Sequence, residues 1–263
     1  MLSILNSIDV YSWCLLISLL LGLCLAAFAG KITWGAKTGR NVDFDDELKV
    51  VLGGTLSMLG LLIGFILSFA ISGLNTRVVA EENEAIAIGN AFQRTTLLSE
   101  SQQQKAEIML QDYLALRISF FETNDDSKRA AIRMESINAQ SHMWALISKI
   151  AKEKSGSVIL SVLNASGELY VSQQKTMSSW RRQIPGVAWV LLVLCAACSN
   201  FLIGYNARGS SRGNTLVCIM PVFTALALFM IAEIDVPGKG LIQVSPDNLR
   251  ALVLTLKHGG LTL

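Results

Sequence analysis

Few residues in this chain have types and spacings that could do chemistry. There are two histidines, His142 and His258, which lie far apart in the sequence. Cys195 and Cys198 have CxxC spacing, but no second pair or histidine accompanies them, so we interpret them as packing residues rather than a metal or redox site. No phosphate-binding glycine loop, serine elbow or HExxH sequence is present. The sequence therefore predicts no enzyme, no cofactor and no metal site.

A cluster of charged residues follows an apolar stretch that ends at Leu74. Arg77 comes first, and Glu81, Glu82 and Glu84 follow it closely. An acidic run of this kind is usually a solvated helix face. The functional interpretation is a ring of charges at the mouth of a pore, to which several copies of the chain contribute. Arg77, Glu81 and Glu84 are therefore candidate pore-mouth residues.

The apolar stretch from Val50 to Leu74 has one face of small residues. Steps of three or four residues place them on the same side of a helix. They are Gly53 and the five candidate pore-lining residues Ser57, Gly60, Gly64, Ser68 and Ser72. Small faces let membrane helices pack closely, because van der Waals contact drives association within lipid. A row of Gly and Ser can equally border a water-filled path, and both interpretations stay open at this point.

The composition is that of an integral membrane protein. Of the 263 residues, 52% are hydrophobic and only 16% are charged, whereas soluble domains have about 25% charged residues. The net charge of +2 gives no argument for nucleic acid as a partner. About 20 apolar residues suffice to cross a bilayer, and four uncharged runs qualify: 10–30, 50–74, 183–207 and 213–232. With four prolines in the chain, we expect an all-α fold.

The polar segment between the second and third runs predicts a helical bundle outside the membrane. Its apolar residues recur at helical spacing in four stripes, and we expect the outer two helices to be continuous with membrane helices. The tail predicts a short amphipathic helix with Leu249 and Leu252 on its apolar side, capped by Ser245 or Asp247. The expected divisions are 1–74, the first membrane pair; 75–182, the bundle; 183–232, the second membrane hairpin; and 233–263, the tail.

Two segments carry a resemblance to a known family. The segment 84–94, EAIAIGNAFQR, is similar to the stretch E-A-N-A-I-G-T-A-Y-x-R of the bacterial bestrophin-like membrane proteins of unknown function. The segment 233–245, EIDVPGKGLIQVS, resembles the tail of that family, D-x-D-x-P-x-x-G-L-I-x-V-S. Ile86 departs from the usual Asn of the family. The residues that match are Glu84, Gly89, Arg94, Asp235, Pro237, Gly240 and Ser245.

The resemblance implies an ion channel. True bestrophins, to which the family is remotely related, are oligomeric channels whose second membrane helix lines the pore. By this analogy Val50–Leu74 lines a path for ions in a homo-oligomer, in the cytoplasmic membrane of a bacterium. The alternative is a non-conducting sensor or scaffold that signals through its helical bundle. A membrane enzyme or transporter is less favoured, because the four spans contain no Asp, Glu, Lys or Arg. Positive charges on the two sides are nearly balanced, so both orientations stay open.

Overall fold

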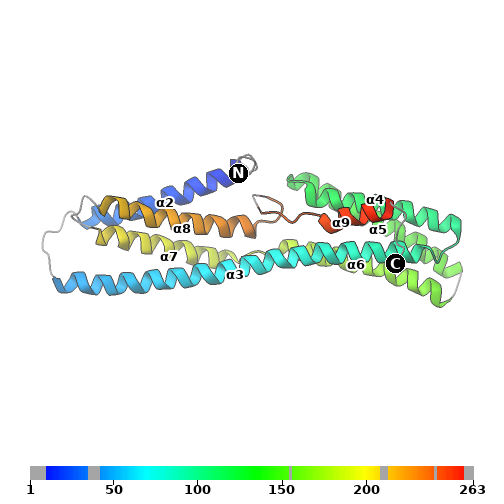
Figure 1. The fold of residues 1–263 in the computed structure, drawn as a ribbon, viewed down its shortest axis with the longest axis horizontal. Coiled ribbons are helices and arrows are strands. Elements are labelled where there is room, and N and C mark those ends of the chain that lie inside the picture. The colour runs from blue at the N-terminus through cyan, green and yellow to red at the C-terminus, as the bar shows by residue number, and fades with distance from the viewer. Residues whose placement is uncertain (1–9, 35–41, 154–155, 208–212, 240–241, 258–263) are drawn as a thin grey trace. The chain divides into compact units, whose positions relative to one another are not determined.

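The protein is all-α, as the sequence predicts. The computed structural model describes residues 10–34, 42–153, 156–207, 213–239 and 242–257, and every regular element within these ranges is a helix. Figure 1 shows them along the chain. They are α2 (Val10–Trp34), α3 (Val42–Thr95), α4 (Glu100–Glu122), α5 (Asp126–Glu153), α6 (Ser157–Arg181), α7 (Gly186–Asn206), α8 (Gly213–Asp235) and α9 (Asp247–Lys257).

Four stretches of the described helices are long and apolar enough to cross a membrane. They are Ser12–Ile32, Glu47–Thr95, Ser157–Asn206 and Val217–Asp235. The second stretch also includes the polar part of α3, and the third comprises α6, the non-helical residues 182–185 and α7. The helices α4 and α5 lie between the two stretches in the chain. The predicted fold class is therefore confirmed: four membrane-crossing helices with a helical region between the second and the third.

The chain divides into two compact units. The membrane unit comprises 1–72 and 183–242, and the bundle unit comprises 73–182 and 243–263. Helix α3 contributes residues to both units without a break in its helical structure, which confirms the expectation that the second membrane helix continues as one rod.

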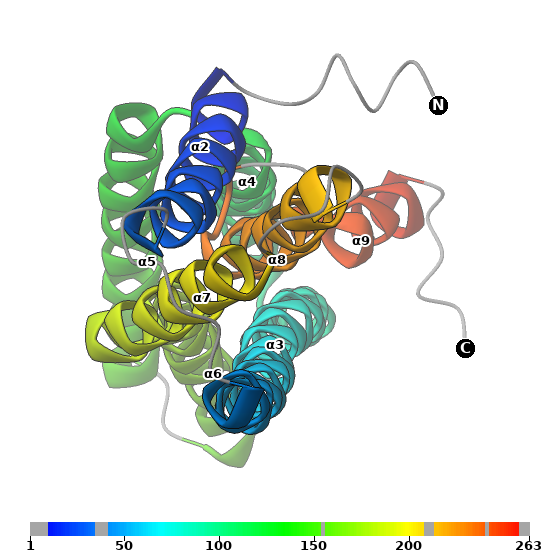
Figure 2. The same cartoon turned by 90° about the vertical axis from the view of Figure 1, so that its left-hand side faces the viewer.

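In the membrane unit, α2 packs against α7 and α8, and the three helices lie side by side in Figures 1 and 2. The approach of α2 to α7 is close enough for their backbones to touch. A Cβ atom built on Gly204 would lie 1.8 Å from the carbonyl oxygen of Ala27, and one on Gly30 would lie 2.0 Å from that of Phe201. Both positions therefore require glycine, and the contact is the small-residue packing that membrane helices favour.

The described residues of the bundle unit share one buried core. It lies between α4, α5, α6, α9 and the part of α3 that belongs to this unit. The large apolar and aromatic side chains of this core that are at most 1% exposed include Ile88, Leu110, Tyr113, Leu169 and Leu249. Because Leu249 belongs to the tail helix, α9 is part of this core rather than an appendage to it.

One expectation about helix continuity is wrong. The sequence suggested that the last bundle helix runs on into the third membrane helix, but α6 ends at Arg181 and α7 begins at Gly186. Pro185 is the N-cap residue of α7, with extended backbone at φ −56° and ψ 137°. A proline disfavours helical conformation in the residue before it, so the helix breaks here.

Candidate functional site

The five candidate pore-lining residues form an exposed face of α3. Ser57, Gly60, Gly64, Ser68 and Ser72 are all exposed in the described chain. A Cβ atom built on Gly60 or Gly64 would meet no atom of the described protein within 4 Å. The small-residue face therefore does not pack against the other described helices of its own chain, unlike Gly30 and Gly204 of α2 and α7.

The side chains of Arg77, Glu81 and Glu84 lie inside the bundle unit. They are 2%, 1% and 0% exposed, whereas Glu82 is exposed. The interpretation of this cluster as a solvated helix face is therefore wrong for Glu81 and Glu84 and holds for Glu82. Arg77 donates from Nη2 to the carbonyl oxygen of Arg182, at 3.0 Å. The pore-mouth role of these residues stays a prediction. Because other side chains separate them from solvent, an ion would not contact them directly.

Glu81 of α3 holds the start of the tail helix. Its Oε1 accepts a hydrogen bond from the backbone N–H of Leu249 at 3.0 Å, and its Oε2 accepts one from Nδ2 of Asn248 at 2.7 Å. The first backbone N–H groups of a helix have no partner within the helix, and a carboxylate there also meets the positive end of the helix dipole. The expected capping by Ser245 or Asp247 is wrong: the carboxylate that caps α9 comes from α3.

Glu84 is the centre of a buried polar network. The guanidinium of Arg117 on α4 donates to both carboxylate oxygens, through Nε to Oε1 and through Nη2 to Oε2, the latter at 3.2 Å. Tyr113, also on α4, donates to Oε1 at 3.2 Å, and Thr176 on α6 donates to Oε2 at 2.7 Å. Gln140 on α5 donates in turn to the Tyr113 hydroxyl at 3.0 Å. The network thus joins α3, α4, α5 and α6.

The electrostatics of this network favour an ion pair beside a neutral phenol. Burial, the largest single effect, lowers the pKa of Arg117. The charge of Glu84, the interaction with Tyr113 and the hydrogen bond to Glu84 together outweigh it, so the pKa is raised above its ordinary value. Burial and the charge of Glu84 raise the pKa of Tyr113 well above its ordinary value, so its hydroxyl keeps its proton. The guanidinium of Arg117 also lies 4.4 Å from the ring centroid of Phe120, a favourable cation–π distance.

Other residues of the first family motif also contact the bundle. Arg94 donates from Nη1 to the carbonyl oxygen of Ser161 at 3.3 Å and lies 3.7 Å from the carboxylate of Glu168. A Cβ atom on Gly89 would lie 3.5 Å from Cδ1 of Leu252, an ordinary contact distance. Ile86, where the family pattern has Asn, is 53% exposed. The first family motif thus lies on the part of α3 that packs against the other helices of the bundle unit.

The second family motif forms the end of α8 and the entry to the tail. Asp235 accepts a hydrogen bond from the backbone N–H of Ile184 at 2.9 Å, within the membrane unit. Pro237 and Gly238 follow in a turn, and Gly238 has a φ of 70°, as the glycine after proline does in a type II turn. Ser245 donates to the carboxylate of Asp247 at 2.6 Å. Gly240 lies outside the residues that the structure describes.

Sequence reasoning missed the partners of Glu84. The apolar residues that recur near helical spacing in α4 are Ile108, Leu110, Leu114, Ile118 and Phe121. Arg117 lies three residues after Leu114 and four before Phe121, so it falls on the buried side of that stripe. A charged residue within an apolar stripe is a signal for a buried partner of opposite charge, because an unpaired charge is costly to bury.

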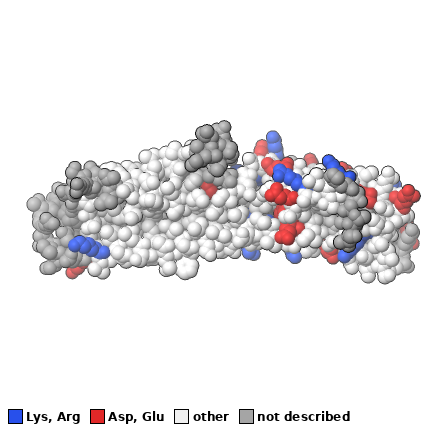
Figure 3. Space-filling model, in the orientation of Figure 1, with Lys and Arg blue, Asp and Glu red and all other residues white. Residues whose placement is uncertain are grey.

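The two units differ in surface charge, which fits a protein that lies partly in lipid. On the face that Figure 3 shows, the membrane unit is almost free of charged side chains, whereas many cover the bundle unit. No group of His, Cys, Asp and Glu in the described part of the chain could hold a metal ion. The fold and the charge distribution together define a multi-span helical membrane protein.

The family follows from comparison with known proteins. The family model for the bestrophin-like domain matches residues 23–249, which include both motifs and most of both units. The chain belongs to the bestrophin-like family, and the resemblance noted in the two motifs is confirmed. Searches of curated proteins and of solved structures returned no significant match.

Proposed function

We propose that this protein is a homo-oligomeric ion channel in which α3 lines the path. The observation that carries the proposal is the small-residue face of α3, which is exposed in a chain that belongs to the bestrophin-like family. An exposed face with no bulky side chain leaves room for water when several copies surround a common axis. The residues along the path would be Ser57, Gly60, Gly64, Ser68 and Ser72.

The chemistry of this face suits ions in transit. The hydroxyl groups of Ser57, Ser68 and Ser72 can replace part of the hydration shell of an ion without binding it tightly. Flanking leucine and isoleucine side chains can close such a path by excluding water. The charges of Arg77, Glu81 and Glu84 would act on ions through the field of the bundle rather than by contact, because these side chains are buried. The proposed setting is the cytoplasmic membrane of a bacterium.

Recording from planar bilayers tests the proposal. Purified wild-type protein, reconstituted under asymmetric salt, is expected to give discrete currents, and the reversal potential then gives the preferred ion. Gly64→Trp should abolish the current while the protein stays folded, because a Cβ atom at Gly64 meets no atom of the described residues within 4 Å. The matched control is Phe69→Trp, an exposed aromatic position about 140° around the same helix at 100° per residue; it should conduct as the wild type does.

Two results would count against the channel. Currents that persist unchanged in Gly64→Trp would show that the path does not follow this face. Silence from folded wild-type protein, over a range of voltages and pH values, would favour the non-conducting sensor or scaffold that signals through the bundle.

A further inference from the structure

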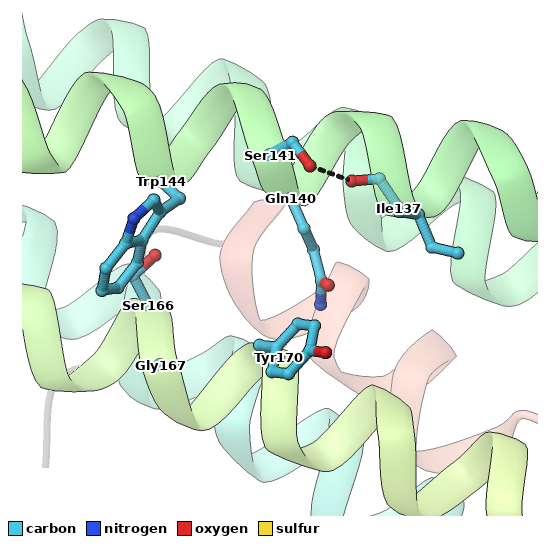
Figure 4. A pocket seen from close by; sticks show the side chains of 7 residues that line it. All are labelled: Ile137, Gln140, Ser141, Trp144, Ser166, Gly167 and Tyr170. Atoms are coloured by element: carbon cyan, nitrogen blue, oxygen red, sulfur yellow. Dashed lines mark hydrogen bonds between the residues drawn. The ribbon is translucent and has the colours of Figure 1, made fainter.

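A cavity opens between α5 and α6 within the bundle unit, and the channel proposal makes no use of it. Its volume is about 410 Å³, within the range of about 300–1,000 Å³ typical of small-molecule sites. Trp144 of α5 and Tyr170 of α6 lie at its rim and are 47% and 57% exposed. Figure 4 shows the lining residues on the two helices: Ile137, Gln140, Ser141, Trp144, Ser166, Gly167 and Tyr170.

The amide of Gln140 gives this cavity a fixed acceptor. Its Nε2 donates to the carbonyl oxygen of Leu169 at 3.1 Å and to the hydroxyl of Tyr113 at 3.0 Å. A carbonyl oxygen can only accept, so Leu169 sets the orientation of the amide and leaves Oε1 as an acceptor. The hydroxyl of Ser141 donates to the carbonyl oxygen of Ile137 at 3.0 Å, so it too offers an acceptor to an occupant.

The charge of the lining selects the kind of occupant. None of the seven lining residues carries a charge, whereas a neighbouring cavity of about 540 Å³ is lined by Glu168 and Lys175 among others. A charged ligand would lose hydration in the first cavity without gaining a partner of opposite charge, which is costly. The cavity therefore complements a neutral molecule.

We propose that this cavity binds a small neutral molecule with a flat aromatic ring and an N–H donor. The ring would contact the side chains of Trp144 and Tyr170, since aromatic groups pair favourably in stacked and edge-to-face arrangements. The N–H group would donate to Oε1 of Gln140. This site does not depend on whether the protein conducts ions.

A ligand in this cavity would also stabilise the polar network in the core of the bundle. Gln140 joins the cavity to Tyr113, and Tyr113 donates to Glu84 on α3. An occupant that holds the Gln140 amide thus supports the network that joins four helices. Because a ligand that binds only the folded state stabilises it, binding raises the Tm of the bundle.

Isothermal titration calorimetry on the full-length protein in detergent tests the site with two probes. Naphthamide is neutral and carries an amide N–H, whereas naphthoate has nearly the same shape and a negative charge. We expect naphthamide to bind at least tenfold more tightly and to raise the Tm. Gly167→Leu should weaken this binding at least tenfold, because Gly167 lines this cavity as well as its neighbour and a Cβ atom there meets no described atom within 4 Å, so the larger side chain narrows the site.

Two further variants separate a lost site from a lost fold. Trp144→Ala removes one aromatic wall and should weaken naphthamide binding at least tenfold. Met134→Ala, at an exposed position of the same helix that does not line the cavity, should bind as the wild type does. Equal affinity for the two probes, or full binding by Gly167→Leu, would overturn the proposal. A wild type that binds neither probe would also overturn it. If, in addition, the oligomer dissociated in Gly167→Leu, the cavity would be occupied by a second copy of the chain.

Discussion

Arg117 and Glu84 form a buried ion pair between α4 and α3, and both side chains are 0% exposed. The carboxylate also accepts hydrogen bonds from Tyr113 and Thr176, so both of its oxygens have more than one donor. A buried ion pair adds less to stability than its charges suggest, because both groups lose their hydration. Removing only one member of the pair is costly, because the remaining charge stays buried without a partner.

The first prediction concerns the removal of one charge from this pair. Glu84→Gln should destabilise the bundle unit by about 3–5 kcal/mol, because the guanidinium of Arg117 is left buried and uncompensated. Chemical unfolding of purified protein in detergent measures the change. Glu82→Gln is the matched control, since Glu82 is exposed and exposed substitutions usually change stability by less than about 0.5 kcal/mol. Equal stability of Glu84→Gln and Glu82→Gln would contradict the buried network.

A second prediction concerns high pH. The pKa of Tyr113 is raised above its ordinary value of 10.0 in the folded protein, first by burial and then by the charge of Glu84. Above about pH 10 the unfolded chain releases this proton while the folded protein keeps it, so stability falls as the pH rises. Unfolding measured between neutral pH and the alkaline range should show a shallower decline in Tyr113→Phe than in the wild type. If stability declined equally steeply with pH in Tyr113→Phe and the wild type, folding would not raise the pKa of Tyr113.

The third prediction concerns the anchoring of the tail. Glu81→Ala removes the carboxylate that caps α9, and loss of such a cap costs about 0.5–2 kcal/mol. The amide hydrogens of α9, including that of Leu249, should therefore exchange faster with solvent, while those of α5 keep their protection. Hydrogen exchange followed by mass spectrometry measures both. Asp247→Ala, an exposed acid in the first turn of α9, serves as the comparison; an equal effect there would mean that Glu81 is not the principal cap.

The sequence predicts the helices better than it predicts which faces meet. Apolar periodicity and uncharged runs were enough to place the membrane helices and the bundle between them. Small-residue spacing was not enough, because it singled out α3, whereas the backbones that touch belong to Gly30 and Gly204 of α2 and α7. The spacing of Gly and Ser shows that a helix has a face of small residues. Whether that face packs closely depends on which other helix lies against it in the folded chain.

Polar contacts between residues far apart in the chain could not be predicted from the sequence either. The expected caps of α9 were its near neighbours, because capping rules are local. Glu81 lies 167 residues before Asn248, and only the folded chain brings them together. Arg117 is the exception, since its place on the apolar stripe of α4 was visible in the sequence.

The fourth prediction uses two glycines to compare small faces. Alanine is favoured over glycine in a helix by about 0.5–1 kcal/mol. Gly64→Ala should therefore leave the protein as stable as the wild type or more so, because the added methyl group meets no atom within 4 Å. Gly204→Ala should destabilise it, because the methyl group would lie 1.8 Å from the carbonyl oxygen of Ala27 and the overlap is with backbone.

The same pair of variants separates the two interpretations of the α3 face. If the face borders water in an oligomer, Gly64→Ala should leave the oligomer mass unchanged and the Tm equal to that of the wild type or higher, as measured by light scattering and thermal unfolding in detergent. If the face instead packs tightly against a second copy, the methyl group would meet the partner's backbone and Gly64→Ala would dissociate the oligomer. That second result would sink the pore assignment of Gly64 while leaving the fold of the single chain intact.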